Sequence, residues 1–564
     1  MHPRLIGVET EYSLAWVPRE PGGRAPIPRD IYQAVEAAVR AEVPALPAAE
    51  PKGGVFLATG GLLHYEAQMS LFSNGLLEMA TPECRGPLEA ARYHHAQDEL
   101  LARGHAEAEF RLRTLGFEGE LVIGKAAADT AGNVWGSHEN YEIDDRPGAL
   151  RLLFLCIAFP MFWIPAVLAE WAFKFAVTAT FYAAAGFHRV CTFIAPVPRI
   201  GRPFDAVARA IFELGRWLFR ERTLMKFFNL LATATMPWIR AYDIVLLATA
   251  FPRARRLLLP HLVTRLVYCG PGRVPANGVS IALSQKASSI RYTAGIYWND
   301  AKRPVFDLKN FVREPWSIWR RRKRLQVLFA DSNTSRLATA LRLGTTDLVL
   351  RMIEAGHPLR DLTPRDLRSA IAIVDGDPAL TRTIPLADGS AMTALEIQRY
   401  YLAEAEKFCG KNVEPETAEV LSKWRYVLEA LAEDPHLLYK EVDWVAKRDL
   451  VAEALAAEGG WRGVAKAATA ATAEGAATLA AAQKIDARFH EIGPRGYGSA
   501  LMDAGRARAY FDGPELDRAT REPASSPRAR ARGEAVRRHS GGEREARVSW
   551  SELLLQHPRK RVRL

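Results

Sequence analysis

Two carboxylates stand two residues apart near the start of the chain, in the sequence GVETEY at 7–12. The flanking residues predict a β-strand, in which Glu9 and Glu11 point to the same face about 6.6 Å apart. Two like charges at that spacing repel each other unless water or a cation lies between them. The pattern leaves two alternatives: a solvated edge of a sheet, or a face that binds a hard metal ion through oxygen ligands.

The elements that must position this pair are short strands with one or two helices between them. The run DIYQAVEAAVRAEV at 30–43 has apolar residues at helical spacing. Residues 55–68 predict a hairpin that turns at two glycines, and the run GLLEMATPEC at 75–84 predicts another strand. Residues 119–143 predict two strands joined by a turn that contains glycine and asparagine. We therefore expect the first part of the chain, 4–145, to be rich in strands.

The size and composition of the chain are those of a folded protein of two or three domains. It has 564 residues, of which 49% are hydrophobic and 25% charged. The formal net charge of +11 favours an acidic partner: nucleic acid, an anionic membrane, nucleotide phosphate or an acidic protein. We find no zinc-finger spacing and no RNP-like strand, so a nucleic-acid partner is not expected.

The cysteines and the N-terminus indicate a reducing compartment. Five cysteines are scattered along the chain and never stand in CxxC spacing, which argues against a disulfide scaffold or a structural zinc site. The first residues, MHPRLIGVETEY, lack the apolar core of a signal peptide. We therefore expect a cytoplasmic protein.

A hydrophobic segment at 148–252 interrupts this pattern. Within it, residues 152–169 form a stretch of 18 without a charge, which is near the lower limit for spanning a bilayer. A basic stretch at 216–226 stands beside further apolar runs, as on a cytoplasmic membrane face. We expect a helical insertion, and three alternatives remain: membrane association, a buried soluble module or a surface that docks a protein.

The globular pattern resumes at 253 and continues to about 500. Residues 325–356 predict a strand followed by a long amphipathic helix. An Ala-rich insertion at 451–482 has helix propensity but little apolar bulk to pack. The last part, 501–564, is Arg-rich, and its charge alone would predict a disordered basic arm before a final strand-like run.

Several of these stretches, in their order along the chain, resemble the family of the prokaryotic ubiquitin-like protein (Pup) ligase and the related Pup deamidase, or depupylase. They are GVETEY at 7–12, LLEMATPEC at 76–84, DTAGNVWGSHENY at 129–141, LVTR at 262–265, LSQKA at 283–287, ADSN at 330–333, ALEIQRYY at 394–401, EVDWVAKRDL at 441–450 and PRARARGE at 527–534. The form GVETEY is closer to the ligase branch. The hydrophobic segment and the Ala-rich insertion lie outside the resemblance.

The resemblance implies an α+β fold like that of glutamine synthetase: a curved antiparallel sheet forms a cradle, and helices cover its outer side. The cradle would be built from 1–147 and 253–500, and a small C-terminal domain at 501–564 would complete the nucleotide site. ATP and Mg²⁺ would bind in the cradle. A glutamate side chain of a small acidic Pup-like modifier would be phosphorylated and joined to a lysine amine of a target protein.

The family pattern also implies roles for individual residues. Glu9, His64 and Glu78 fall on metal-binding positions, Glu66 falls on the catalytic base, and Thr81 and Trp550 fall on ATP contacts. Arg265 in LVTR is a further candidate ATP contact, through phosphate, or a contact of the substrate carboxylate. The strand at 62–66 departs from the family, which has arginine, tyrosine and aspartate where this chain has Leu62, His64 and Glu66. Imidazole suits Mg²⁺ poorly, and a leucine cannot replace a cation at a phosphate.

These departures keep two other functions open. A depupylase would use the same cradle for hydrolysis. A degenerate, membrane-docked binding protein would keep the fold without turnover. Glutamates on strands are ordinarily solvated surface residues and exposed arginines are common, so each assignment depends on where the fold places the side chain.

Overall fold

The computed structural model divides the chain into two compact units, one formed by 1–145, 253–307 and 322–564 and the other by 146–252 and 308–321. The structure describes residues 4–50, 52–67, 75–129, 134–145, 148–194, 207, 210, 241, 243–296, 303–470, 472–503, 511–541, 545–556 and 560–564. The larger unit carries the predicted site residues.

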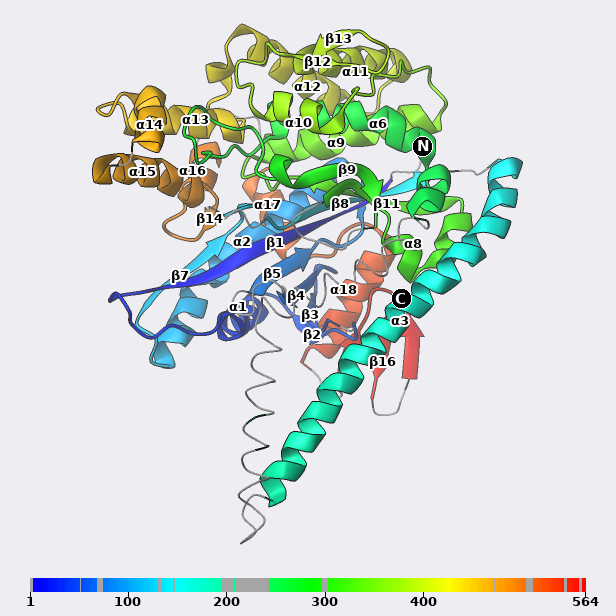
Figure 1. The fold of residues 1–564 in the computed structure, drawn as a ribbon, viewed down its shortest axis with the longest axis vertical. Coiled ribbons are helices and arrows are strands. Elements are labelled where there is room, and N and C mark those ends of the chain that lie inside the picture. Colours follow the sequence, from blue (N-terminus) through cyan, green and yellow to red (C-terminus); the bar gives the residue numbers. More distant parts are fainter. Residues whose placement is uncertain are drawn as a thin grey trace. The chain divides into compact units, whose positions relative to one another are not determined.

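The larger unit is built on a twelve-stranded sheet that is mostly antiparallel (Figure 1). Its main path runs β2 (Ala45–Pro47), β3 (Val55–Leu57), β4 (Leu62–Ala67), β5 (Gly75–Ala80), β1 (Leu5–Pro18), β8 (Ser137–Asp144), β11 (Arg322–Ala330), β10 (Arg303–Asp307) and β9 (Ile290–Gly295). Off this path, β6 (Cys84–Arg85) and β7 (Gly119–Gly124) pair with β1, and β14 (Glu491–Ile492) pairs with β7. β9 and β10 pair in parallel.

The register of the central strands decides which side chains share a face. Glu11 lies opposite Glu78 where β1 pairs with β5, and His64 lies opposite Glu78 where β4 pairs with β5. Directly opposed residues of antiparallel strands point to the same side of the sheet. The residues between them, such as Leu63, point to the other side.

Helices cover this other side. Thr10 and Tyr12 of β1 reach α2 (Pro87–Thr114): the Thr10 hydroxyl lies 3.1 Å from His94 Nδ1, and the Tyr12 hydroxyl donates to Asp98 over 2.8 Å. α1 (Pro28–Glu42) packs on α2, and α9 (Arg336–Glu354) contacts both α2 and β8 (Figure 1). We call the opposite side of the sheet, which carries Glu9, Glu11, His64 and Glu78, the open face.

The larger unit contains further helices after the hydrophobic segment. They are α6 (Pro252–Thr264), α7 (Leu266–Cys269), α10 (Leu367–Asp375), α11 (Ala394–Cys409), α12 (Pro415–Glu433), α13 (Asp443–Ala454), α14 (Gly460–Thr469), α15 (Ala473–Phe489) and α16 (Gly498–Asp503), with a small sheet of β12 (Thr383–Pro385) and β13 (Ala391–Thr393). The Ala-rich insertion forms α14 and α15, which pack on each other and share a small core with Val274 and Val451.

The Arg-rich end of the chain is folded. It forms α17 (Gly513–Arg521), α18 (Pro527–His539) and a three-stranded sheet of β15 (Ala546–Val548), β16 (Glu552–Leu555) and β17 (Lys560–Arg563). α18 contacts β2 and β3, so this end packs against the edge of the main sheet. The α+β fold with a helix-covered, mostly antiparallel sheet is therefore as predicted.

The smaller unit contains α3 (Ala149–Ile194), which includes Pro160 and Pro165, together with α8 (Asn310–Arg313). The predicted basic stretch at 216–226 lies outside the described residues. Within the part of the chain that is described, no helix meets the length and apolarity needed to cross a membrane.

Candidate active site

The open face carries a row of polar side chains across five neighbouring strands. Strand alternation and register place them there: β4 contributes alternate residues beginning at Leu62, and β5 contributes Glu78. The row includes His64 and Glu66 on β4, Glu78 on β5, Glu9, Glu11 and Ser13 on β1, His138, Asn140 and Glu142 on β8, and Arg324 and Gln326 on β11. The predicted metal and base residues therefore lie on one face.

Three of these residues form a compact group, which we call the His64 cluster: His64, Glu66 and Glu78. The imidazole Nε2 lies 3.4 Å from Glu66 Oε2 and 3.3 Å from Glu78 Oε2. One ligand atom from each residue can be chosen so that all three lie within 4.8 Å of one another. The His64 side chain is 4% exposed and that of Glu66 is 29% exposed. The imidazole is therefore enclosed by protein, whereas the Glu66 carboxylate is partly accessible to solvent.

The charges in the cluster shift its acid–base properties. Burial acts to lower the pKa of His64, but hydrogen bonds to Glu66 and Glu78 outweigh it and raise the pKa to about 9. Burial acts to raise the pKa of Glu66, but His64 and Lys52 outweigh it and lower the pKa to about 2. At neutral pH the cluster without a metal therefore holds a protonated imidazole beside ionised Glu66.

Lys52, in the loop before β3, places a second cation at the cluster. Its ammonium forms a hydrogen-bonded ion pair with Glu66 Oε2 and lies 3.8 Å from Glu78 Oε2. The side chain of Lys52 is 48% exposed, so it reaches the carboxylates from the solvent side. The solvent side of Glu66 is therefore occupied by the Lys52 ammonium.

Glu9 belongs to a separate group on the same face. Its Oε1 accepts from Arg324 over 2.8 Å and from Asn140 over 3.2 Å, and His138 Nδ1 lies 3.5 Å from its Oε2. Burial acts to raise the pKa of Glu9, but Arg324 and His138 outweigh it and lower the pKa to about 2. Glu11 lies between the two groups; its Oε2 accepts from the backbone N–H of Gly136 over 2.8 Å, and burial raises its pKa.

The donor set of the His64 cluster fits a divalent cation. One imidazole nitrogen and two carboxylate oxygens converge closely enough to contact a single ion. Glu9 offers only oxygen, the donor that Mg²⁺ prefers.

The predicted ATP contacts Thr81 and Trp550 lie next to the same strands. Thr81 Oγ1 accepts from the Val8 backbone N–H over 2.9 Å, where β5 leaves β1. Trp550 packs edge-on against Phe56 of β3, with ring centroids 5.1 Å apart, and Phe56 pairs with Leu62. The buried Leu62 is thus part of an apolar patch under the C-terminal sheet rather than a phosphate contact.

The guanidinium of Arg532 lies beside this patch, but it already forms hydrogen bonds within the protein. Arg532 of α18 lies over the Trp550 ring, 4.6 Å from its centroid, and donates to the carbonyl oxygens of Gly60 and Trp550. It also forms an ion pair with Glu83. Arg532 therefore holds the C-terminal end of the chain to the sheet edge.

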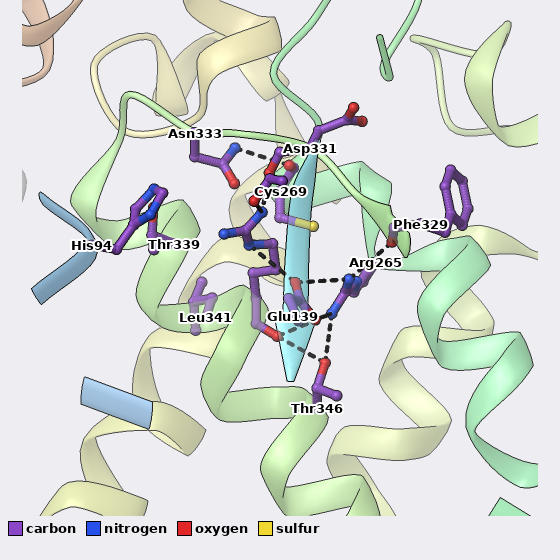
Figure 2. A network of polar contacts seen from close by, with 12 residues as sticks. His94, Glu139, Arg265, Cys269, Phe329, Asp331, Asn333, Thr339, Leu341 and Thr346 are labelled. Atoms are coloured by element: carbon purple, nitrogen blue, oxygen red, sulfur yellow. Dashed lines mark hydrogen bonds and ion pairs between the residues drawn. The ribbon is translucent and has the colours of Figure 1, made fainter. Parts of the chain in front are cut away.

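The prediction that Arg265 contacts ATP is wrong, because this residue lies on the helix-covered side of the sheet (Figure 2). Its side chain is 1% exposed and forms an ion pair with Glu139 of β8, at 3.0 Å. It also donates to Thr346 and to the carbonyl oxygen of Phe329. Glu139 alternates with the open-face residues His138 and Asn140, so Arg265 is a structural residue of the core.

Lys52 and Arg324 are the site residues that the sequence reasoning missed. Lys52 lies in a Pro/Gly-containing loop and gave no periodic signal. Arg324 belongs to an alternating run on β11, which is a detectable signal, but only its pairing with β8 shows that it reaches Glu9.

Comparison with curated proteins finds relatives in both branches of one family. The chain is 32% identical over 321 residues to a depupylase of Acidothermus cellulolyticus, which covers 55% of this chain and 59% of the relative. It is 32% identical over 310 residues to a Pup–protein ligase of Nakamurella multipartita, which covers 54% of this chain and 64% of the relative. The matched part spans less than two thirds of either relative.

Solved structures share the fold. The crystal structure of the complex between Pup and its ligase PafA aligns with a TM-score of 0.66 at 20% identity, covering 100% of this chain and 89% of the ligase. The structure of the Pup ligase PafA with ADP aligns with a TM-score of 0.61 at 20% identity, covering 97% and 93%. The Pup-ligase protein family model matches residues 4–554, and the chain belongs to this family.

Proposed function

We propose that this protein is an ATP- and metal-dependent carboxylate–amine ligase that acts on a Pup-like modifier. It phosphorylates a glutamate side chain of the modifier and joins it to a lysine amine of a target protein through an isopeptide bond. The observation that carries this proposal is the open face itself, where the carboxylates of the His64 cluster and of Glu9 lie on the same side of neighbouring strands. Family membership and the structural likeness to a ligase solved with ADP support it.

Glu9, His64 and Glu78 are the residues we assign to divalent cations. A cation bound there would neutralise the charge that develops on a phosphoryl group during transfer. Arg324 and Asn140 fix the carboxylate of Glu9 through the bonds to its Oε1. His64 is held by its burial and by the two carboxylates beside it.

Glu66 is the residue we assign as general base. A base must come within hydrogen-bond distance of the amine proton that it removes. The ion pair with Lys52 supports this role, because in it a lysine ammonium of the chain itself contacts Glu66 Oε2 from the solvent side. While Lys52 and His64 occupy this carboxylate its basicity is low, so the incoming amine must take the place of Lys52.

Thr81 and Trp550 are the residues we assign to the nucleotide. Trp550 presents an aromatic ring beside the edge strands of the sheet, and Arg532 holds that ring in place. The acidic modifier we propose also suits the formal charge of +11.

Hydrolysis of a modifier conjugate is the second candidate function. It is favoured by the relative named as a depupylase, which matches at the same identity as the ligase relative. The replacement of a phosphate-contacting arginine by buried Leu62 would also weaken a reaction that depends on ATP.

Contact between the 148–252 segment and a membrane stays a prediction. Large apolar side chains of α3 are exposed, among them Trp171 at 69% and Phe175 at 75%. Their exposure supports a covering partner or a lipid surface. Fractionation of the full-length protein at low and high salt, with and without detergent, tests this prediction.

One experiment separates the candidate functions. The full-length protein is incubated with ATP, Mg²⁺, a lysine-bearing target peptide and a Pup-like peptide that ends in glutamate or in glutamine. We expect ADP formation with the glutamate peptide, loss of isopeptide product in Glu66→Gln, and retention in Glu404→Gln, a control on α11. Ammonia release from the glutamine peptide assigns the hydrolase. Nucleotide binding without either product contradicts both enzymatic functions.

A further inference from the structure

His64 gives the metal site of this chain a nitrogen donor. The imidazole Nε2 points between the two carboxylates of the His64 cluster, at 3.3 Å and 3.4 Å from their oxygens. Its side chain is almost fully buried, so the ring has little freedom to turn away from them.

The strand around His64 is fixed by a close backbone contact. Gly54 has a φ of +89°, and a Cβ there would lie 2.5 Å from His64 Cβ and 2.3 Å from the carbonyl oxygen of Leu63. The backbone of the preceding loop therefore packs directly on β4 at this position. The nitrogen donor is consequently held where the two carboxylates converge.

A site with one imidazole and two carboxylates does not suit all divalent cations equally. Mg²⁺ prefers oxygen ligands and keeps several water molecules, and it gains little from an imidazole. Divalent transition metals bind imidazole nitrogen well, and carboxylate oxygens complete their coordination. The affinity of the His64 cluster should therefore rise more for a transition metal than for Mg²⁺.

We infer that the His64 cluster selects a divalent transition metal over Mg²⁺, with His64 as the residue that determines the choice. This inference rests on the proposed function, which assigns a cation to these residues. Glu9, whose carboxylate is held by Arg324 and Asn140, then remains the position for the Mg²⁺ that accompanies ATP. One cradle would thus carry two metal positions.

The test measures metal binding without ATP or modifier, so that turnover plays no part in it. Mn²⁺ is titrated into the full-length protein and the free ion is followed by electron paramagnetic resonance; Mg²⁺ affinity is obtained by competition. We expect wild type to bind Mn²⁺ more tightly than Mg²⁺. His64→Gln should weaken Mn²⁺ binding by about tenfold or more, since even losing a group that only orients a ligand has that effect.

Two further variants make the test decisive. His64→Tyr introduces the residue that the family resemblance places here, and it should abolish the preference for Mn²⁺ while Mg²⁺ binding is retained. His357→Gln is the matched control, because His357 Nε2 also lies beside a carboxylate, 2.8 Å from Glu404 Oε2, on the helical part of the unit. It should leave Mn²⁺ binding unchanged.

The outcomes distinguish failure of the metal preference from failure of the proposed function. Equal affinity of wild type for both ions, or unchanged Mn²⁺ binding in His64→Gln and His64→Tyr, overturns the inference while the ligase proposal stands. If wild type binds neither ion, the metal assignment within the proposed function fails as well.

Discussion

Replacing Lys52 with methionine should strengthen the binding of a divalent cation at the His64 cluster. Lys52 Nζ is paired with Glu66 Oε2 and lies 3.8 Å from Glu78 Oε2, so its positive charge occupies the carboxylates that a metal would use. A metal ion must either displace this ammonium or bind against its repulsion. Methionine keeps most of the aliphatic length and removes the charge.

The size of the effect follows from the distance and the exposure. A unit charge at 3.8 Å from another interacts by about 1 kcal/mol in water and about 4 kcal/mol at an effective dielectric constant near 20. Lys52 is 48% exposed, so the lower value applies. Ion pairs of such exposure contribute about 0.2–1 kcal/mol, and 1.4 kcal/mol is a factor of ten, which gives affinity about 1.4- to fivefold higher in Lys52→Met.

The assay is the Mn²⁺ titration of the full-length protein, carried out at low and at physiological salt. The gain should be larger at low salt, because mobile ions screen the exposed ammonium. Lys407→Met is the matched control. Lys407 forms a similar exposed pair with Glu404, at 2.7 Å, on α11. Its removal should not change metal affinity.

Equal or weaker Mn²⁺ binding in Lys52→Met would refute the view that Lys52 competes with the metal. A loss of ATP affinity together with unchanged metal affinity would show instead that the ammonium serves the phosphates. In that case Lys52 would supply the positive charge at the phosphates that Leu62 cannot supply.

Three further predictions concern the support of the site. Arg265→Met should destabilise the protein by about 1.5–3 kcal/mol, because it removes one of the two guanidinium partners of buried Glu139, while Arg342 stays 3.2 Å away; nucleotide affinity of the folded fraction should not change, and a selective loss of ATP binding would contradict the structural role. Burial lowers the pKa of His95 to about 4. Stability from neutral His95 is therefore complete above its ordinary pKa of about 6.5 and is lost as pH falls towards 4, by about 3 kcal/mol. His95→Asn should flatten this part of the pH–stability curve measured by denaturant unfolding; an unchanged slope would contradict the assignment. Gly54→Ala should lower the unfolding temperature more than Gly53→Ala, since both residues have positive φ but only Gly54 would bring a Cβ against neighbouring backbone; equal losses in thermal unfolding would refute the contact argument.

Much of the open face could be predicted because strand alternation is a local property. The spacing of Glu9 and Glu11, and of His64 and Glu66, already places each pair on one side of a strand. The meeting of His64 with Glu78 depends on the register between β4 and β5, which the intervening residues do not encode in any periodic way. Only the family resemblance, which places both His64 and Glu78 at metal-binding positions, predicted that these two residues lie together.

The errors and omissions have a common physical cause. An arginine near a family motif reads the same in sequence whether it faces a phosphate or a buried carboxylate. Arg265 pairs with Glu139, whose own direction follows from the alternation of β8. Lys52 reaches the cluster only because two glycines with positive φ follow it and return the chain to β3. Long-range geometry of this kind has no signature in local composition.

The residues of β4 that differ from the family pattern change the distribution of charge at the site. Leu62 removes a positive charge from the family pattern and joins an apolar patch with Phe56 and Trp550. His64, two residues further along the same face of β4, and Lys52, from the loop before β3, return positive charge directly at the carboxylates. The anionic cluster is thus balanced without a metal, and a metal must replace a proton on His64 and the ammonium of Lys52. Both replacements couple cation binding to the release of Glu66, the residue that the proposed reaction needs as a free base.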